Sequence, residues 1–89
     1  MIAKRVVIGG RVQGVGYRAW MVREAQSLGV WGWVRNRPDG TVEAVAHGDT
    51  DAVEELLRRC RRGPMLAAVR SIDETDADPP DGEGFRQLG

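Results

Sequence analysis

A glycine-rich stretch near the N-terminus carries the residues best suited to chemistry. It reads Gly9-Gly10-Arg11-Val12-Gln13-Gly14-Val15-Gly16-Tyr17-Arg18 and lies between a β-branched run and a segment with helical character. Glycines let the backbone approach a ligand closely, and the N–H groups at the start of a helix point toward an anion. Arg18 would add a forked, permanently charged donor suited to phosphate or carboxylate. The stretch therefore predicts anion binding, with phosphate as the favoured anion.

Two common nucleotide-binding motifs do not fit this stretch. A Walker A loop would need Lys and Ser or Thr where Val15 and Gly16 stand, although Gly9 and Gly14 have the right separation. A dinucleotide fingerprint would need a parallel strand–helix–strand unit, whereas the sequence that follows is rich in hairpin signals. The stretch is therefore predicted to be a phosphate loop of another kind.

The composition limits the class of protein. The 89 residues suffice for one small domain, predicted over residues 1–89. The 13 basic and 13 acidic residues give a formal net charge of zero, which does not favour general capture of nucleic acid. No apolar run approaches the roughly 18 residues of a membrane helix, and the N-terminus lacks the apolar stretch of a signal peptide. With a single cysteine, Cys60, we expect a cytoplasmic protein that has no membrane partner.

The hydrophobic pattern predicts the elements that must position the loop. Alternation marks strands and a 3.6-residue period marks helices, with Gly29 and Gly63-Pro64 as helix stops. The turn sequence Pro38-Asp39-Gly40 joins two strands into a hairpin. The order β-α-β-β-α-β is that of an α+β ferredoxin-like two-layer sandwich, in which two helices cover one face of an antiparallel sheet. Strands are expected over residues 4–9, 30–37, 41–47 and 67–75, helices over 17–28 and 50–62, and a possible short fifth strand over 85–88.

The second predicted helix has a clear amphipathic pattern. Asp49, Thr50 and Asp51 are all candidate N-caps, and Asp51 with Glu54 resembles a capping box, which would satisfy N–H groups at the start of this helix. Cys60 shares the apolar face and is therefore predicted to be an inert core thiol. The positions expected in the core follow i, i+3, i+4, i+7 spacing and are Val53, Leu56, Leu57 and Cys60.

Two separated motifs give the sequence a family resemblance. Residues 10–18 match the signature G-x-V-Q-G-V-x-[FY]-R throughout, and residues 32–36 match the block G-[FWY]-V-x-N. With Asp39-Gly40-Thr41-Val42 and the Gly-Pro after the second helix, the sequence resembles the acylphosphatase family over almost its whole length. Because two motifs occur in the right order, this resemblance is far more specific than a glycine-rich loop alone.

The resemblance implies a small metal-free hydrolase that needs no cofactor. Such enzymes cleave the carboxyl–phosphate bond of small acyl phosphates to a carboxylate and inorganic phosphate. By this resemblance Arg18 clamps the phosphate, Asn36 orients the attacking water, and a free phosphate or sulfate ion can occupy the same site. The segment 85–88 only partly matches the final strand of the family, and we expect this departure hardly to touch the site. The implied phosphate cradle is the backbone of Gln13, Gly14, Val15, Gly16, Tyr17 and Arg18.

The aromatic residues of the second predicted strand leave another function class open. Alternation places Trp31, Trp33, Arg35 and Arg37 on one face, and sheets of this fold that bind RNA stack bases on such aromatics. The sequence has no RNA-recognition motif and no net positive charge, which counts against an RNA partner. A third alternative is a module of a larger hydrogenase-maturation protein. We expect instead a free-standing monomer that acts on a small acyl phosphate and binds no nucleic acid.

Overall fold

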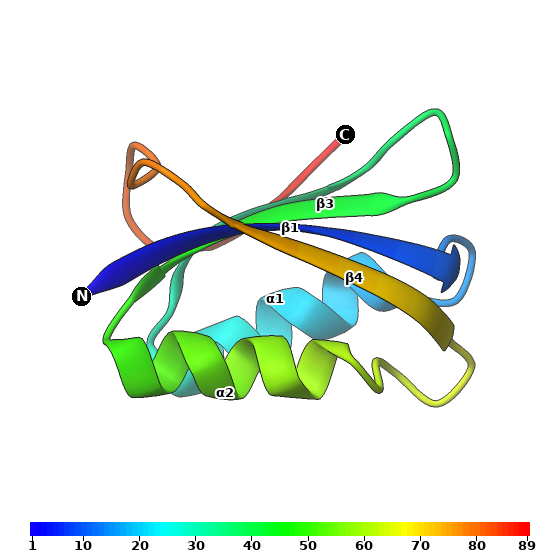
Figure 1. Cartoon of the computed structure of the whole chain (residues 1–89), viewed down its shortest axis with the longest axis horizontal. Helices are drawn as coiled ribbons and strands as arrows, with labels where there is room; N and C mark the ends of the chain where they lie inside the picture. Colours follow the sequence, from blue (N-terminus) through cyan, green and yellow to red (C-terminus); the bar gives the residue numbers. More distant parts are fainter.

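Alternating apolar residues build a five-stranded sheet, and two amphipathic helices cover one face of it (Figure 1). The computed structural model describes residues 1–89. The element order is the predicted β-α-β-β-α-β, and the fifth strand is formed. The strands are β1 (Ile2–Arg11), β2 (Trp31–Asn36), β3 (Val42–Gly48), β4 (Ala68–Asp76) and β5 (Phe85–Leu88), and the helices are α1 (Tyr17–Leu28) and α2 (Thr50–Cys60).

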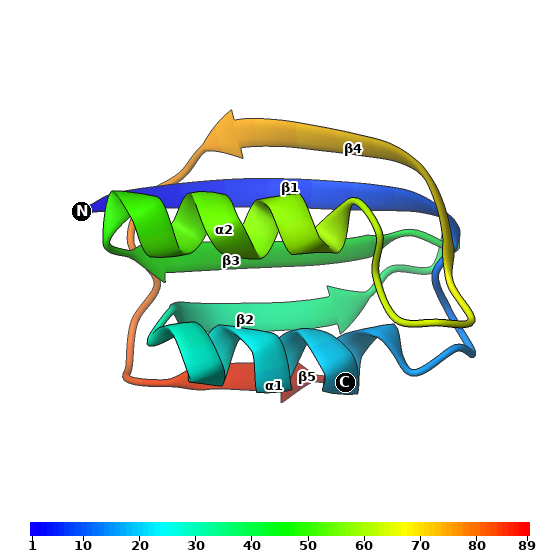
Figure 2. The same cartoon turned by 90° about the horizontal axis from the view of Figure 1, so that it is seen from below.

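The strand order of the sheet is β4-β1-β3-β2-β5. All neighbouring strands are antiparallel except β2 and β5, which run parallel. Seen from the helix side, α2 lies over β1 and β3, and α1 lies over β2 and β5 (Figure 2). The carboxyl ends of β2 and β5 therefore point to the same edge of the sheet, where α1 begins.

The core lies between the sheet and the two helices, as the predicted periodicities require. Val6 and Ile8 of β1 are fully buried against the helices, and Met21 and Ala25 of α1 are fully buried against the sheet. Burying an aliphatic side chain of this size contributes about 1.5–3 kcal/mol, so this layer supplies most of the driving force for folding. The predicted core face of α2 is confirmed, because Val53, Leu56, Leu57 and Cys60 are all buried.

The ends of the helices differ in detail from the prediction. Of the candidate N-caps, Asp49 is confirmed, because α2 begins at Thr50 and Asp49 occupies the N-cap position. The capping box of Asp51 and Glu54 is wrong. The first intrahelical bond runs from Val53 N–H to Asp49 O at 2.9 Å, so Asp51 already lies inside the first turn. The predicted stop at Gly29 is confirmed by its left-handed conformation at the end of α1. With 12 and 11 residues, neither helix is long and apolar enough to span a bilayer.

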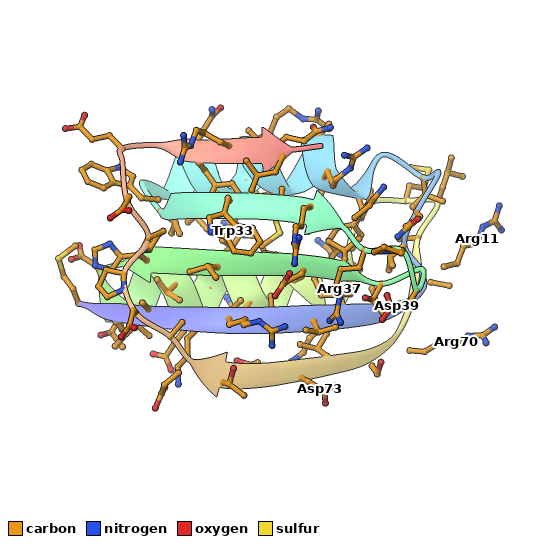
Figure 3. The ribbon with its side chains drawn as sticks, turned by 90° about the horizontal axis from the view of Figure 1, so that it is seen from above. Arg11, Trp33, Arg37, Asp39, Arg70 and Asp73 are labelled. Atoms are coloured by element: carbon orange, nitrogen blue, oxygen red, sulfur yellow. The ribbon has the colours of Figure 1, made fainter.

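The open face of the sheet carries a carboxylate held by two arginines. Glu43 of β3 is 5% exposed and lies 2.6 Å from both Arg5 of β1 and Arg35 of β2. Burial by itself raises the pKa of Glu43, but the hydrogen bonds from Arg35 and Arg5 outweigh it and hold the pKa below its ordinary value. Trp33 lies on this open face (Figure 3), with its ring 5.8 Å from the Arg35 guanidinium. The network therefore links the three central strands.

Tyr17 and Cys60 join the two helices inside the core. The Tyr17 hydroxyl donates a 2.6 Å hydrogen bond to the backbone carbonyl of Cys60, and both residues are fully buried. Burial raises the pKa of the Cys60 thiol from 9.0 to about 12, and it likewise raises the pKa of the Tyr17 phenol. Both groups therefore keep their protons in the folded protein at a pH where the unfolded chain begins to lose them.

This difference predicts a loss of stability at alkaline pH. Below pH 8 the thiol is protonated in both states, so its contribution is fully present. Between pH 9 and pH 10 the unfolded chain releases the Cys60 proton, and the free energy of unfolding should fall by about 1 kcal/mol. Urea unfolding in the presence of a reductant at pH 8, 9 and 10 measures this fall. A Cys60→Ala variant should be less stable throughout but lack most of the decline, and an equal decline in both proteins would contradict the assignment.

Candidate anion-binding site

The loop between β1 and α1 has a backbone conformation that suits glycine at two positions. Gly14 and Gly16 have φ values of +74° and +78°, in the left-handed region that side-chain-bearing residues rarely adopt. Gly16 is also the N-cap residue of α1, and no side chain caps this end of the helix. The backbone N–H groups at the start of α1 are therefore not satisfied by a capping side chain and remain accessible to a ligand.

A run of backbone donors in this loop has no partner inside the protein. None of the N–H groups of residues 13–16 donates a hydrogen bond to another backbone group. The first intrahelical bond of α1 runs from Trp20 N–H to Gly16 O at 3.0 Å, so the N–H groups of residues 17–19 have no acceptor within the helix. The first turn of α1 contains no acidic residue. This end of the helix is electropositive and rich in free donors, which is the environment that binds an anion.

A cavity of about 150 Å³ lies against these donors. Of the residues predicted for the cradle, Gly14, Gly16, Tyr17 and Arg18 line this cavity, and Asn36 faces it from β2. Gln13 and Val15 do not line it. The buried Tyr17 side chain is turned toward α2, so at this position the backbone is the group that can serve a ligand. The complete lining consists of Val12, Gly14, Gly16, Tyr17, Arg18, Ala19, Asn36 and Gln87.

Arg18 is oriented by the backbone of the last strand. Its Nη1 donates hydrogen bonds to the carbonyl oxygens of Gly89 at 2.7 Å and Leu88 at 3.2 Å. A guanidinium has five N–H donors, so Nε and Nη2 remain free for an anion. The expectation that the segment 85–88 hardly touches the site is therefore wrong. β5 packs against α1 and supplies the lining residue Gln87 and one acceptor for Arg18, Leu88 O, while the residue after the strand, Gly89, supplies the other.

Asn36 ends β2 on the side of the sheet that faces the helices. Its neighbour two residues earlier, Val34, is fully buried on this side, and alternation turns Asn36 the same way. The side-chain hydrogen bonds at the site are those of Gln13 and Arg18, and none of them involves Asn36. The Asn36 amide therefore faces the cavity with its donor and acceptor capacity unused.

The side chain of Gln13 ties the loop to the hairpin that follows Asn36. Its Nε2 donates to the carbonyl oxygens of Arg37 at 2.8 Å and Thr41 at 2.9 Å, on either side of the turn. The turn itself is closed by Asp39, which accepts hydrogen bonds from the Thr41 hydroxyl at 2.6 Å and the Thr41 N–H at 3.0 Å; these bonds lower the pKa of Asp39. Gln13 thus couples the position of the loop to that of Asn36. The family motif implied a role only for the backbone of Gln13 and did not indicate this role of its side chain.

Further arginines surround this end of the molecule. Arg11 and Arg70 project away from the body of the protein (Figure 3), and neither takes part in an ion pair. Arg37 lies 3.7 Å from Asp39, at the turn. These charges add to the attraction for an anion. No group of three or more His, Cys, Asp or Glu side chains is arranged to hold a metal ion.

Comparison with known proteins points to one family. Residues 4–87 match the family model described as Acylphosphatase. The chain is 62% identical over 85 residues to the acylphosphatase of Acidiphilium cryptum (strain JF-5), which covers 96% of this chain and 93% of that protein. It is 54% identical over 86 residues to the acylphosphatase of Rhizorhabdus wittichii, covering 97% and 87%. The crystal structure of acylphosphatase from Bacillus subtilis superposes on all of both chains with a TM-score of 0.93 and 33% identity.

The contacts of Gln13 predict that its side chain controls anion affinity from outside the cavity. A Gln13→Met variant keeps the length of the side chain but loses both hydrogen bonds to the hairpin. We expect it to bind inorganic phosphate about tenfold more weakly, because about 1.4 kcal/mol of preorganisation is lost. NMR titration of the backbone amides of residues 13–19 with phosphate measures this affinity. A Gln26→Met variant on the exposed side of α1 is the matched control, and wild-type affinity in Gln13→Met would disprove the coupling.

Proposed function

The chain belongs to the acylphosphatase family and is an acylphosphatase, and we propose that residues 13–18 and Asn36 carry out its hydrolysis of acyl phosphates. One observation carries this proposal. Unpaired backbone N–H groups, a guanidinium with free donors and an unpartnered side-chain amide converge on one cavity. The first two suit a phosphate group, and the third suits a water molecule beside it.

The phosphate group of the substrate is proposed to bind against the loop. Backbone N–H groups of the 13–18 loop donate to its oxygens, above all those of the cavity-lining residues 14 and 16–18. The Arg18 fork binds two of the oxygens through Nε and Nη2. The hydrogen bonds from Arg18 Nη1 to Leu88 and Gly89, at the end of β5 and just after it, hold the guanidinium in one orientation before the substrate arrives. Donors that are fixed in advance stabilise the charge of the transition state without reorganising during the reaction.

Asn36 is proposed to hold the attacking water. The water oxygen forms a bond to phosphorus while the bond from phosphorus to the carboxyl oxygen breaks, and the carboxylate leaves with the electron pair. One proton of the water passes to a phosphate oxygen, so an acyl phosphate and water become a carboxylate and inorganic phosphate. An amide has no basic group near pH 7, but it orients water through its donor and its acceptor.

The side chains that line the site include no carboxylate, histidine or lysine that could act as a general acid or base, and this is consistent with an acyl phosphate substrate. A carboxylate is a good leaving group, so the reaction needs no strong general acid. The reaction needs the substrate and the water to be positioned, and it needs the charge on the phosphoryl oxygens to be stabilised. These two effects dominate catalysis of phosphoryl transfer in general. The steps proposed here use only groups of the chain and the substrate, and they require neither a metal ion nor a cofactor.

We also propose that the active unit is one copy of the chain, a single domain that acts in the cytoplasm and binds neither nucleic acid nor membrane. Every group assigned to the site comes from one chain, and the hydrophobic core is closed within it. The lone thiol, Cys60, is free and buried, as expected for a reducing compartment. On the open face, Arg35 is engaged by Glu43, which leaves less charge beside Trp33 for an RNA backbone.

The proposed roles predict how two substitutions affect hydrolysis of benzoyl phosphate in the presence of EDTA. Arg18→Ala should lower kcat/KM by about 100- to 1000-fold, the effect of losing one preorganised anion donor, and Arg18→Lys should restore little because a point charge does not replace a fork. Asn36→Ala should lower kcat by a similar factor while inorganic phosphate inhibits as before, because the loop that binds phosphate is intact.

Arg23→Ala is the matched control for Arg18→Ala, since Arg23 is an exposed arginine on α1 without an ion pair. Its activity should equal that of the wild type. Turnover that disappears with EDTA would refute the metal-free route, and full activity in Arg18→Ala or Asn36→Ala would remove that residue from the mechanism. Urea unfolding of each variant separates a catalytic defect from a folding defect.

A further inference from the structure

The side chain of Gln87 faces the same cavity as Asn36. It lies on β5, where Phe85 is buried toward the helices and alternation turns Gln87 the same way. In the parallel register of β2 and β5, Gln87 lies opposite Val34. Asn36 is two residues beyond Val34 on the same face, so Asn36 and Gln87 are diagonal neighbours across two adjacent strands. Like Asn36, Gln87 forms none of the side-chain hydrogen bonds at the site.

This arrangement lets the two amides share one small ligand. With neighbouring strands about 4.8 Å apart and a rise of about 3.3 Å per residue, diagonal neighbours on one face of the sheet are roughly 8 Å apart. An Asn and a Gln side chain are together long enough to reach across this separation, so both amides can contact one water molecule in the cavity that they line. Both residues line the cavity that is proposed to hold the phosphate, so a water between them would lie beside the phosphoryl group.

A water held ready for attack needs more than one partner. Ordered waters in proteins make about three hydrogen bonds, with a range of two to four. Among the other polar side chains of the cavity, Arg18 can only donate, and the Tyr17 hydroxyl is bonded to the carbonyl of Cys60. Gln87 is therefore the one lining side chain besides Asn36 that can both accept a hydrogen bond from the water and donate one to it.

We propose that Gln87 is a second ligand of the attacking water. The proposal rests on the role of Asn36 given above and extends it. One amide accepts a hydrogen bond from the water and the other donates one to it. This leaves one lone pair of the water for phosphorus and one O–H for the phosphate oxygen that receives the proton. The water oxygen then bonds to phosphorus as the carboxylate departs with its electron pair.

The test is the hydrolysis of benzoyl phosphate by a Gln87→Met variant, which keeps the side-chain length and loses the amide. We expect kcat to fall about three- to tenfold, the effect of one neutral hydrogen bond, while the inhibition constant of inorganic phosphate stays the same. Gln87→Asn, which retains a shorter amide, should recover part of the rate. Because the Gln87 side chain is exposed, the urea midpoint of these variants should not change.

A double-mutant cycle with Asn36→Ala separates a shared water from a general effect on the strand. If both amides hold the same water, Gln87→Met should cost less in the Asn36→Ala background than in the wild type. Arg86→Met is the matched control, since Arg86 adjoins Gln87 but points to the opposite face of β5, and it should leave kcat unchanged.

Two results would overturn the role of Gln87. One is a wild-type kcat in Gln87→Met, whether or not phosphate inhibits more weakly, and the other is an equal fold-loss of kcat with and without Asn36. Failure of the underlying mechanism looks different, because Asn36→Ala would then hydrolyse benzoyl phosphate as fast as the wild type does.

Discussion

The loop between β1 and α1 must keep several backbone N–H groups free of internal partners, and much of the structure serves this constraint. An unpaired donor that is shut away from water costs roughly 1–3 kcal/mol, so such a run persists only where water or an anion reaches it. The loop is therefore held from its two ends and not by bonds within itself. At the C-terminal end of the loop, the Tyr17 hydroxyl donates a hydrogen bond to the carbonyl of Cys60 in α2. At its N-terminal end, the Gln13 amide donates hydrogen bonds to the hairpin. Gly14 and Gly16 supply the left-handed turns between these anchors.

The sheet brings the remaining groups to this loop. Because β5 is parallel to β2, the carboxyl ends of both strands meet the start of α1 at one edge. Asn36 ends β2 there, Gln87 lies on the neighbouring strand, and the carbonyl oxygens after Gln87 hold Arg18. An antiparallel β5 would present its amino end at this edge, and both the amide and the acceptors for Arg18 would be absent. The direction of one short edge strand thus decides how the site is completed.

The open face of the sheet has a different organisation. Glu43 receives hydrogen bonds from Arg5 and Arg35, which lie on the strands to either side. These bonds are charge-assisted, but the arginines are about half exposed, so their contribution to stability is modest and their main effect is to order this surface. The ring of Trp33 lies beside Arg35 within the same cluster. Charges that would otherwise be available to an anionic partner are therefore partly neutralised, whereas Arg11 and Arg70 near the loop form no ion pair.

Features that depend on a local pattern of residues could be predicted from the sequence. Alternation and the 3.6-residue period predicted both helices and four strands to within a few residues and left the fifth strand as a possibility. Two motifs predicted the family that the comparisons confirm. Three neighbouring residues were candidate caps of α2, and the capping box at Asp51 was wrong while Asp49 was right, because the start of that helix depends on where the chain leaves β3. Long-range contacts became visible only in the folded chain. Gln13 holds the hairpin, β5 pairs with β2, Gln87 lines the cavity, and the backbone after Gln87 accepts hydrogen bonds from Arg18. These contacts join segments that are far apart in the chain, and they follow from the order and register of the strands. Strand order and register produce no repeating hydrophobic pattern within either segment, so the contacts could not be predicted from the sequence.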